Sequence, residues 1–208
     1  MPLTPVNSCA KSSVLTGDSM NYGAIKKCDI ANGEGIRTTL FVSGCRNRCK
    51  GCFQPETWDF DYGNPFTDEV AEEIFRTFDN PSVRGLTILG GEPMEPENQE
   101  ALLPFLREFR QRFPDKTVWI YTGNLYEELT GESGANPKHL EITAELLSYV
   151  DILVDGRFVE EEKSLGLRFR GSKNQRIIDM NLTRRSGKVT IWSGCELDKT
   201  YSVSEEKQ

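Results

Sequence analysis

Hydrophobic positions along the chain switch between the period of a strand and the period of a helix. The segment 35–44, GIRTTLFVSG, gathers β-branched and apolar residues in a short run that predicts a strand. The segment 67–78 opens with a threonine and an acidic turn and then places Val70, Ile74 and Phe78 on one helical face. The regular part of the chain is therefore expected to include a strand followed by an amphipathic helix.

The same alternation continues toward the end of the chain. Strands are expected at 85–91, 117–123, 151–156, 175–180 and 188–192, and helices at 96–113 and 143–150. Pro104 is expected to mark an early kink or the true first turn of its helix. Repeated strand and helix units predict a parallel sheet with right-handed crossovers. We expect a single-domain α/β fold, an incomplete TIM-like β/α barrel with mostly parallel strands.

Four of the expected strands end in loops with unusual composition. These loops read SGCRNRCKGC, GGEP, YTGN and VDGRF, in chain order. In parallel sheets the functional loops lie beyond the carboxyl ends of the strands. We therefore expect the four loops to meet on one rim of the fold.

Length and composition limit the possible classes of protein. A chain of 208 residues with 37% hydrophobic content is long enough for one sizeable core. Residues 1–19 are rich in Pro, Ser, Thr and Gly without a regular period, which predicts a disordered N-terminal extension. We expect the folded domain to cover 20–195, followed by a polar C-terminal tail at 196–208.

Charge, hydropathy and cysteine content point to a cytoplasmic protein. The net charge of -7 argues against nucleic acid as a partner. No apolar run is long enough to span a bilayer, and the first residues lack the apolar core of a secretory signal, so no membrane partner is expected. Six cysteines are too few for a disulfide scaffold and indicate metal chemistry in a reducing compartment.

Three cysteines, Cys45, Cys49 and Cys52, lie in one short loop. A structural zinc site normally has four ligands in two pairs, and no second pair follows in this sequence. Three thiolates on a four-iron cluster leave one iron open, as a reactive metal site requires. The spacing therefore favours an open [4Fe-4S] cluster, and a zinc site or a pair of redox thiols remains as the alternative.

The motifs carry a resemblance to a known family. CRNRCKGC is similar to the signature of the radical S-adenosylmethionine superfamily, and GGEP matches its substrate-loop motif. Together with NGEGIRTTLFVSGC, VDGRF and FRGSKNQRIID, they make residues 20–192 resemble the activating enzymes of anaerobic (class III) ribonucleotide reductase. Many superfamily members have an aromatic residue before the last cysteine. Here that position is Gly51 and the aromatic Phe53 follows, an arrangement similar to the reductase-activating enzymes.

The resemblance implies an oxidoreductase with a radical S-adenosylmethionine domain over 20–195. Cys45, Cys49 and Cys52 would hold the [4Fe-4S] cluster, whose open iron chelates S-adenosylmethionine. One electron, from a flavodoxin- or ferredoxin-type donor, would cleave the sulfonium to methionine and a 5′-deoxyadenosyl radical. This radical would generate a glycyl radical on the large subunit of anaerobic ribonucleotide reductase. No side chain is expected to act as a catalytic group, because cluster and S-adenosylmethionine carry the chemistry.

The resemblance also implies a set of residues around S-adenosylmethionine. These are Gly51, Cys52, Phe53, Gly90, Gly91, Glu92, Thr122, Asp155 and Arg176. Gly90 and Gly91 would let backbone approach the methionine portion, and the alternative is an ordinary turn at a strand end. Glu92 would accept a hydrogen bond from the ammonium group or else cap the next turn.

Three of these residues have structural alternatives of their own. Phe53 would lie beside the adenine or anchor the core. Thr122 and Asp155 would orient the sulfonium cofactor or a bound cation, or else cap the next segment.

Basic residues gather in two places. Arg46, Arg48 and Lys50 alternate with the cysteines, where positive charge would favour thiolates. The segment 163–188 holds eight basic residues and one acidic residue, which predicts a docking face for an anionic partner or cofactor group. Its weaker candidates for contacts are Arg170, Asn174, Gln175 and Arg176. Ordinary solvated charges are the alternative in both places.

Other functions remain open on the sequence alone. An activating enzyme of the formate-lyase type, or another small radical S-adenosylmethionine enzyme, would share the cysteines and GGEP. A non-catalytic iron-sulfur or zinc-binding module would share the cysteines only. The single histidine, His139, is expected to be structural, so histidine-based nucleophile activation has little support.

Overall fold

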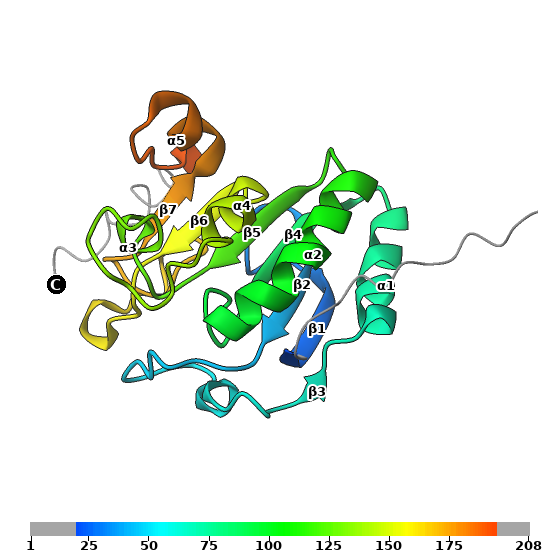
Figure 1. Cartoon of the computed structure of the whole chain (residues 1–208), viewed down its shortest axis with the longest axis horizontal. Coiled ribbons are helices and arrows are strands. Elements are labelled where there is room, and N and C mark those ends of the chain that lie inside the picture. Colours follow the sequence, from blue (N-terminus) through cyan, green and yellow to red (C-terminus); the bar gives the residue numbers. More distant parts are fainter. Residues whose placement is uncertain (1–19, 195–208) are drawn as a thin grey trace, which may run out of the picture.

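The computed structural model describes residues 20–194, and the predictions for 1–19, 195 and 196–208 lie outside this range. Seven strands form one sheet in the order β3-β1-β2-β4-β5-β6-β7 (Figure 1). The strands are β1 (Asn21–Asp29), β2 (Ile36–Val42), β3 (Asn64–Pro65), β4 (Val83–Gly90), β5 (Thr117–Tyr121), β6 (Ile152–Asp155) and β7 (Arg176–Asp179). The α-helices are α1 (Asp68–Arg76), α2 (Pro96–Arg112), α3 (Tyr126–Leu129), α4 (Thr143–Ser148) and α5 (Met180–Ser186).

The sheet is mixed. Strands β2, β4, β5 and β6 are parallel, whereas β1, β3 and β7 pair antiparallel with their neighbours. The short loop 30–35 joins β1 to β2 as a hairpin, and 156–175 returns from β6 to β7 without a crossover α-helix. The prediction of parallel strands is confirmed for the four central strands, whereas a mostly parallel, barrel-like sheet is not confirmed.

Several element boundaries differ from the predictions. Helix α2 begins at Pro96 and runs through Pro104, so Pro104 is not its first turn. The segment 188–192 is not a strand, because it contributes only the isolated bridge between Ile178 and Ile191. Strand β1 and the short helices α3 and α5 were not predicted, because their apolar periodicity is weak.

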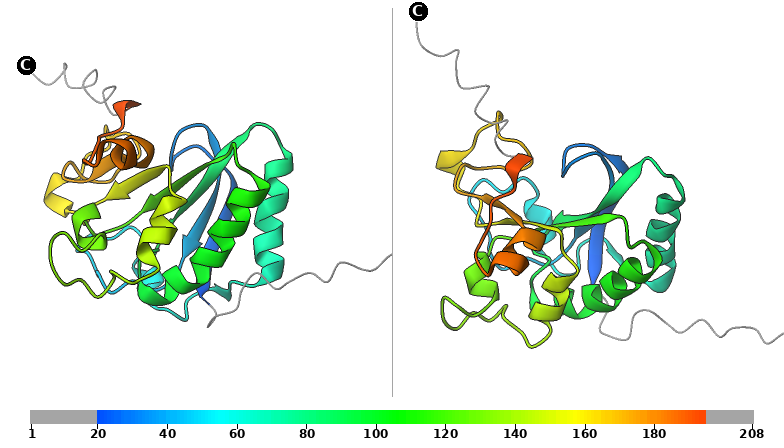
Figure 2. Two further views of the ribbon diagram at one scale, coloured as in Figure 1. Left: turned by 45° about the horizontal axis from the view of Figure 1, so that its top comes forward. Right: turned by 90° about the horizontal axis from the view of Figure 1, so that it is seen from above.

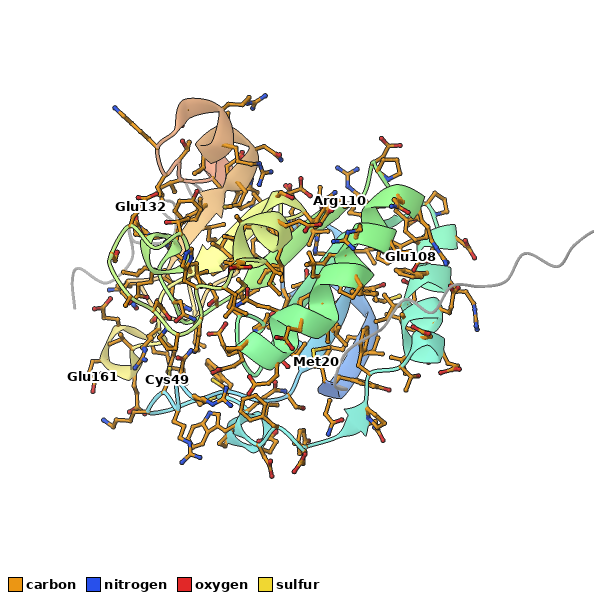
Figure 3. All side chains as sticks on the ribbon, in the orientation of Figure 1. Met20, Cys49, Glu108, Arg110, Glu132 and Glu161 are labelled. Atoms are coloured by element: carbon orange, nitrogen blue, oxygen red, sulfur yellow. The ribbon has the colours of Figure 1, made fainter. Side chains whose placement is uncertain are left out.

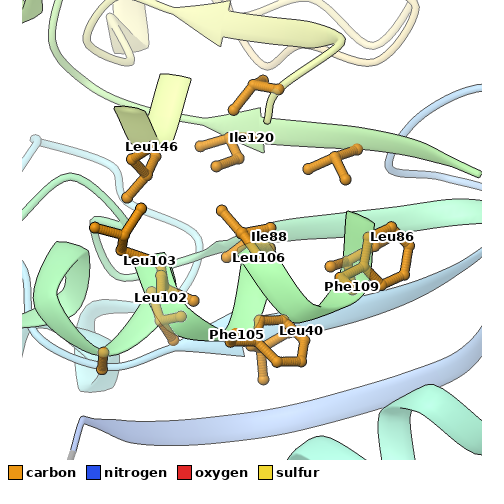
Figure 4. Packing of buried hydrophobic residues seen from close by; sticks show 14 of the residues in the cluster. Leu40, Leu86, Ile88, Leu102, Leu103, Phe105, Leu106, Phe109, Ile120 and Leu146 are labelled. Carbon is orange, nitrogen blue, oxygen red and sulfur yellow. The ribbon is translucent and has the colours of Figure 1, made fainter. Parts of the chain in front are cut away.

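The main core lies between the sheet and helices α1, α2 and α4, which cover one face (Figures 1 and 2). Side chains of α2 meet those of β2, β4 and β5 in this layer (Figure 4). Phe105 of α2 is fully buried and stacks on Phe75 of α1, with ring centroids 5.2 Å apart. Burial of these apolar side chains is the main favourable contribution to folding.

The opposite face of the sheet carries a smaller apolar cluster. Trp119, Val154 and Ile177 are buried there, and Phe169 and Trp192 pack against them. Phe169 of this cluster also belongs to the cavity wall at the ends of the central strands. No helix within residues 20–194 combines the length and apolarity needed to cross a bilayer.

Candidate functional site

A cavity of about 400 Å³ lies at the carboxyl ends of the central strands. Its wall includes Cys45, Cys49 and Cys52 from the loop after β2, and Gly91 from the loop after β4. Thr122, which follows β5, lines it as well. Because parallel strands end on the same edge, loops far apart in sequence share one cavity. The prediction that these loops meet on one rim is confirmed.

The three cysteines differ in exposure. Cys45 is buried, whereas Cys49 and Cys52 are partly exposed and connected by a hydrogen bond of 3.2 Å from the Cys52 N–H to the Cys49 carbonyl. Figure 3 shows Cys49 at the same end of the molecule as Glu161. Within residues 20–194, no three His, Cys, Asp or Glu side chains are grouped closely enough to hold a single metal ion. A four-iron cluster is larger and takes each thiolate on a different iron, so its ligands need not converge on one point.

Two of the three basic residues of the cysteine loop, Arg46 and Lys50, are engaged with carboxylates. Arg46 pairs with Glu95 at 2.8 Å and with Glu97 at 2.6 Å, and Lys50 lies 3.1 Å from Glu160. Burial, followed by the charge of Glu92, raises the pKa of the Cys45 thiol to about 11. The charges of Arg46, Arg48 and Lys50 are not among the causes of this shift, and the expectation that they favour thiolates on a bound cluster stays a prediction.

Glu92 connects three loops of the rim. Its carboxylate accepts hydrogen bonds from Asn47 Nδ2 at 2.7 Å, from the Gly123 N–H at 2.8 Å and from Asn124 Nδ2 at 3.1 Å. The other oxygen accepts from the Met94 N–H at 3.0 Å, which is the capping role left open above. Three of these contacts are on Oε2 and one is on Oε1, so Oε1 keeps a second acceptor position, and a contact between Glu92 and an ammonium group stays a prediction.

A buried charge network lies beneath the cysteine loop. Lys138 donates to Asn47 Oδ1 at 2.8 Å and lies 3.1 Å from Glu95. The Arg46 N–H also donates to Glu95 at 2.8 Å. Glu92 and Glu95 are each 1% exposed. Buried carboxylates are stable only when paired and hydrogen-bonded, so this network fixes the loop after Cys45 against the loop after Gly91.

Gly90 and Gly91 occupy positions with no space for a side chain. A Cβ on Gly90 would lie 2.7 Å from the Val42 carbonyl oxygen, and one on Gly91 would lie 2.6 Å from the Gly44 carbonyl oxygen. Gly90 also has a φ of 112°, which L side chains rarely adopt. These glycines therefore let the strand end approach the backbone of β2 and the cysteine loop, and a contact with S-adenosylmethionine stays a prediction.

Phe53 is 66% exposed, so it is not a core anchor. Its ring lines the cavity and lies 5.4 Å from the ring of Phe158. The Lys163 ammonium lies 4.7 Å from the same ring. Gly51 does not line the cavity and lies against Glu160. The core-anchor alternative for Phe53 is therefore wrong, and its position beside an adenine stays a prediction.

Asp155 and Arg176 bind each other instead of facing the cavity. Arg176 Nε donates to Asp155 at 2.9 Å, and its guanidinium also donates to Glu127 at 2.7 Å and 3.0 Å. Asp155 is fully buried and accepts from the Tyr126 N–H at 2.8 Å, at the start of α3. These hydrogen bonds hold the pKa of Glu127 below its usual range. Both side chains join β6, β7 and α3 and neither lines the cavity, and their contact with a cofactor stays a prediction.

Thr122 lines the cavity, but its hydroxyl accepts from Asn124 Nδ2 at 3.0 Å. Among the weaker candidates, Arg170 and Gln175 line the cavity, and Asn174 does not. Arg170 donates to the Gln175 carbonyl at 2.9 Å. The capping alternative therefore describes the present contacts of Thr122.

The basic segment 163–188 does not present all its charges to solvent. Arg184 donates to the carbonyls of Leu147 and Val150, and Arg168 stacks over Trp192. His139 contacts the Leu129 carbonyl at 2.7 Å, as expected for a structural histidine. The predicted docking face is reduced by these internal contacts.

Tyr121 lines the cavity, but its hydroxyl is buried and has no hydrogen-bond partner within residues 20–194. Burial raises the pKa of Tyr121, so it stays a neutral donor. A buried donor without a partner is costly. In the cavity itself, three thiols and the aromatic side chains of Phe53 and Phe158 fit an iron-sulfur cluster with a nucleoside beside it.

Sequence reasoning missed the residues that support the cysteine loop. Asn47 lies between two cysteines of CRNRCKGC but was given no role, and Glu95 and Lys138 belong to no motif. Lys138 is 91 positions from Asn47. The available signal was the pair of acidic residues Glu92 and Glu95 in and after GGEP. Two carboxylates at a buried strand end would be expected to need a buried cation as a partner.

Comparisons with known proteins agree with this geometry. The 4Fe-4S single cluster domain family matches residues 31–178. Anaerobic ribonucleoside-triphosphate reductase-activating protein of Haemophilus influenzae is 39% identical over 158 residues, which cover 75% of this chain and 96% of that protein. The proteins with the same name from Enterobacteria phage T4 and Escherichia coli K12 are 37% and 35% identical, over 76% and 75% of this chain and 93% and 96% of theirs. The chain therefore belongs to the family of anaerobic ribonucleoside-triphosphate reductase-activating proteins.

Proposed function

We propose that this protein activates anaerobic ribonucleotide reductase by generating a glycyl radical on its large subunit. The observation that carries the proposal is the shared cavity, which is lined by Cys45, Cys49 and Cys52 together with Gly91. Relatives at 35% to 39% identity carry the name of reductase-activating proteins. Together these support a radical S-adenosylmethionine enzyme.

In this proposal the three cysteines hold a [4Fe-4S] cluster and S-adenosylmethionine occupies the remaining cavity. When bound, the cluster supplies the electron that cleaves the sulfonium of S-adenosylmethionine and releases a 5′-deoxyadenosyl radical. A flavodoxin- or ferredoxin-type protein is the proposed electron donor. An incomplete TIM-like barrel is part of the same proposal, because the four parallel strands direct their carboxyl ends to this cavity.

The side chains of this chain bind and orient the reactants. The cysteine loop is fixed by Glu92 through Asn47, which keeps the three thiols on one wall. Phe53 and Phe158 give an aromatic surface beside the cysteines, where an adenine ring would stack. Enclosure of the radical by these groups would prevent side reactions with solvent.

The proposal is tested by anaerobic reconstitution of the full chain with iron and sulfide. With reductant and S-adenosylmethionine, the loaded protein should form 5′-deoxyadenosine. Addition of the reductase should then give a glycyl radical signal in electron paramagnetic resonance. The Cys28→Ala variant is a matched control, because Cys28 is exposed on β1 and does not line the cavity.

Each alternative predicts a different outcome of this experiment. Formation of 5′-deoxyadenosine without a radical on the reductase would favour another radical S-adenosylmethionine enzyme, such as a formate-lyase-type activase. Absence of 5′-deoxyadenosine from protein loaded with four irons per chain would favour a non-catalytic module. Binding of zinc in place of iron would contradict the cluster itself.

A further inference from the structure

Lys138 lies in the loop between α3 and α4, and its ammonium is buried beneath the cysteine loop. The side chain is only 7% exposed. Its Nζ lies 2.8 Å from Asn47 Oδ1, 3.1 Å from Glu95 Oε1 and 4.0 Å from Glu92 Oε2. Lysine is rarely buried unless it is paired, so these contacts are what allow the side chain to remain there.

The backbone of Lys138 is fixed by buried groups. Its carbonyl accepts from Gln99 Nε2 of helix α2 at 2.8 Å, and its N–H donates to Asn136 Oδ1 at 2.8 Å. Gln99 is itself fully buried and accepts from Thr143 Oγ1 at 2.7 Å. The ammonium is therefore presented from a rigid support, not from a solvated loop.

The neighbouring charges make this lysine unusual. Glu92 and Glu95 are each 1% exposed, and their cationic partners within the described residues are Lys138 and Arg46. The Arg46 side chain is 55% exposed and also pairs with Glu97 at the surface. Of these two cations, Lys138 is the buried one. It is also close enough to Cys45 to act on that thiol in the direction opposite to Glu92.

We propose that Lys138 is a positioning residue that orients Asn47 in the cysteine loop and whose charge favours the reduced state of the cluster. This inference rests on the proposed [4Fe-4S] cluster at Cys45, Cys49 and Cys52. A reduced cluster carries one more negative charge, and a cation fixed nearby in a poorly solvated region stabilises that charge. Contacts beyond the ligands are known to tune metal centres in this way.

The test is the midpoint reduction potential of the reconstituted cluster, followed by electron paramagnetic resonance during an anaerobic redox titration. Lys138→Met should reduce the equilibrium constant for one-electron reduction about tenfold, which corresponds to a midpoint about 59 mV more negative. Lys116→Met is the matched control, because Lys116 donates to the Val83 carbonyl at the opposite end of the sheet. Its potential should equal that of the wild type.

Two variants of Glu95 separate charge from folding. Glu95→Gln removes a buried negative charge, so it should move the midpoint in the positive direction. The double variant Glu95→Gln with Lys138→Met removes one charge of each sign, and its midpoint should return toward the wild-type value. If Lys138→Met does not fold, Glu95→Gln decides alone.

An unchanged midpoint in Lys138→Met with full iron, or in Glu95→Gln, would overturn the role of Lys138 and leave the proposed function intact. A double variant that keeps the full shift of Lys138→Met would also overturn it. A wild-type protein that binds no four-iron cluster would instead overturn the proposed function, and this inference with it.

Discussion

Gly90 offers a direct test of how closely the GGEP loop packs against the cysteine loop. Substitution by alanine forces a φ near 112° on a residue with a side chain, which costs about 1–2 kcal/mol. The new Cβ would lie 2.7 Å from the Val42 carbonyl oxygen and 2.9 Å from backbone atoms of Phe41. Because these atoms belong to the paired strand β2, relief requires movement of the sheet, and overpacking of this kind costs a further 1–3 kcal/mol or so.

Gly134 provides the matched control for this prediction. It has a φ of 97°, and a Cβ there would meet no atom within 4 Å. Gly134→Ala should therefore cost only the backbone strain of about 1–2 kcal/mol. Denaturant unfolding of the metal-free proteins measures both values. Equal losses of stability in the two variants would refute the claim that β2 and the GGEP loop are in close backbone contact.

Other variants test the remaining parts of the account. Cys49→Ala should lose the complete cluster and 5′-deoxyadenosine formation, whereas Cys28→Ala should keep wild-type iron content, as chemical iron analysis will show. Leu106→Ala should lower the free energy of unfolding by about 2–5 kcal/mol in denaturant titrations, since Leu106 is fully buried under the sheet. Arg176→Met should destabilise the protein at pH 7 by about 3 kcal/mol, because Asp155 then lacks its cation. The pair with Arg176 lowers the pKa of Glu127 in the folded state, so the stability that Glu127 contributes is present above about pH 4.3 and is lost in more acidic solution. The difference in unfolding free energy between Arg176→Met and the wild type should therefore be smaller at pH 3 than at pH 7.

The central strands and long helices were predictable because their apolar periodicity agrees with their burial. Strand β2 and helix α1 lie within two residues of their expected bounds. The edges of the sheet were not predictable in the same way. Half of the residues of β7 are only partly buried, and 188–192 has the pattern of a strand but makes a single bridge. Strand pairing at an edge is decided by tertiary contacts, and local pattern contains little of that information.

At the site, the motifs identified the residues that line the cavity better than those that support it. The cysteines, Phe53 and Gly91 were found because spacing and residue type are tied to metal and cofactor chemistry. Asp155 was assigned to the cofactor from its place at a strand end and Arg176 from the basic segment 163–188, and in the structure the two side chains pair with each other. A pairing between two strand ends depends on side-chain direction, which the sequence does not specify.

The central claim is that three thiolates leave one iron of the cluster free to bind S-adenosylmethionine. Electron paramagnetic resonance of the reduced, fully loaded protein, recorded before and after addition of S-adenosylmethionine, tests it most directly. The account predicts a clear change of the cluster signal on addition, because the ligand enters the coordination of that iron. An identical spectrum at saturating S-adenosylmethionine would contradict it.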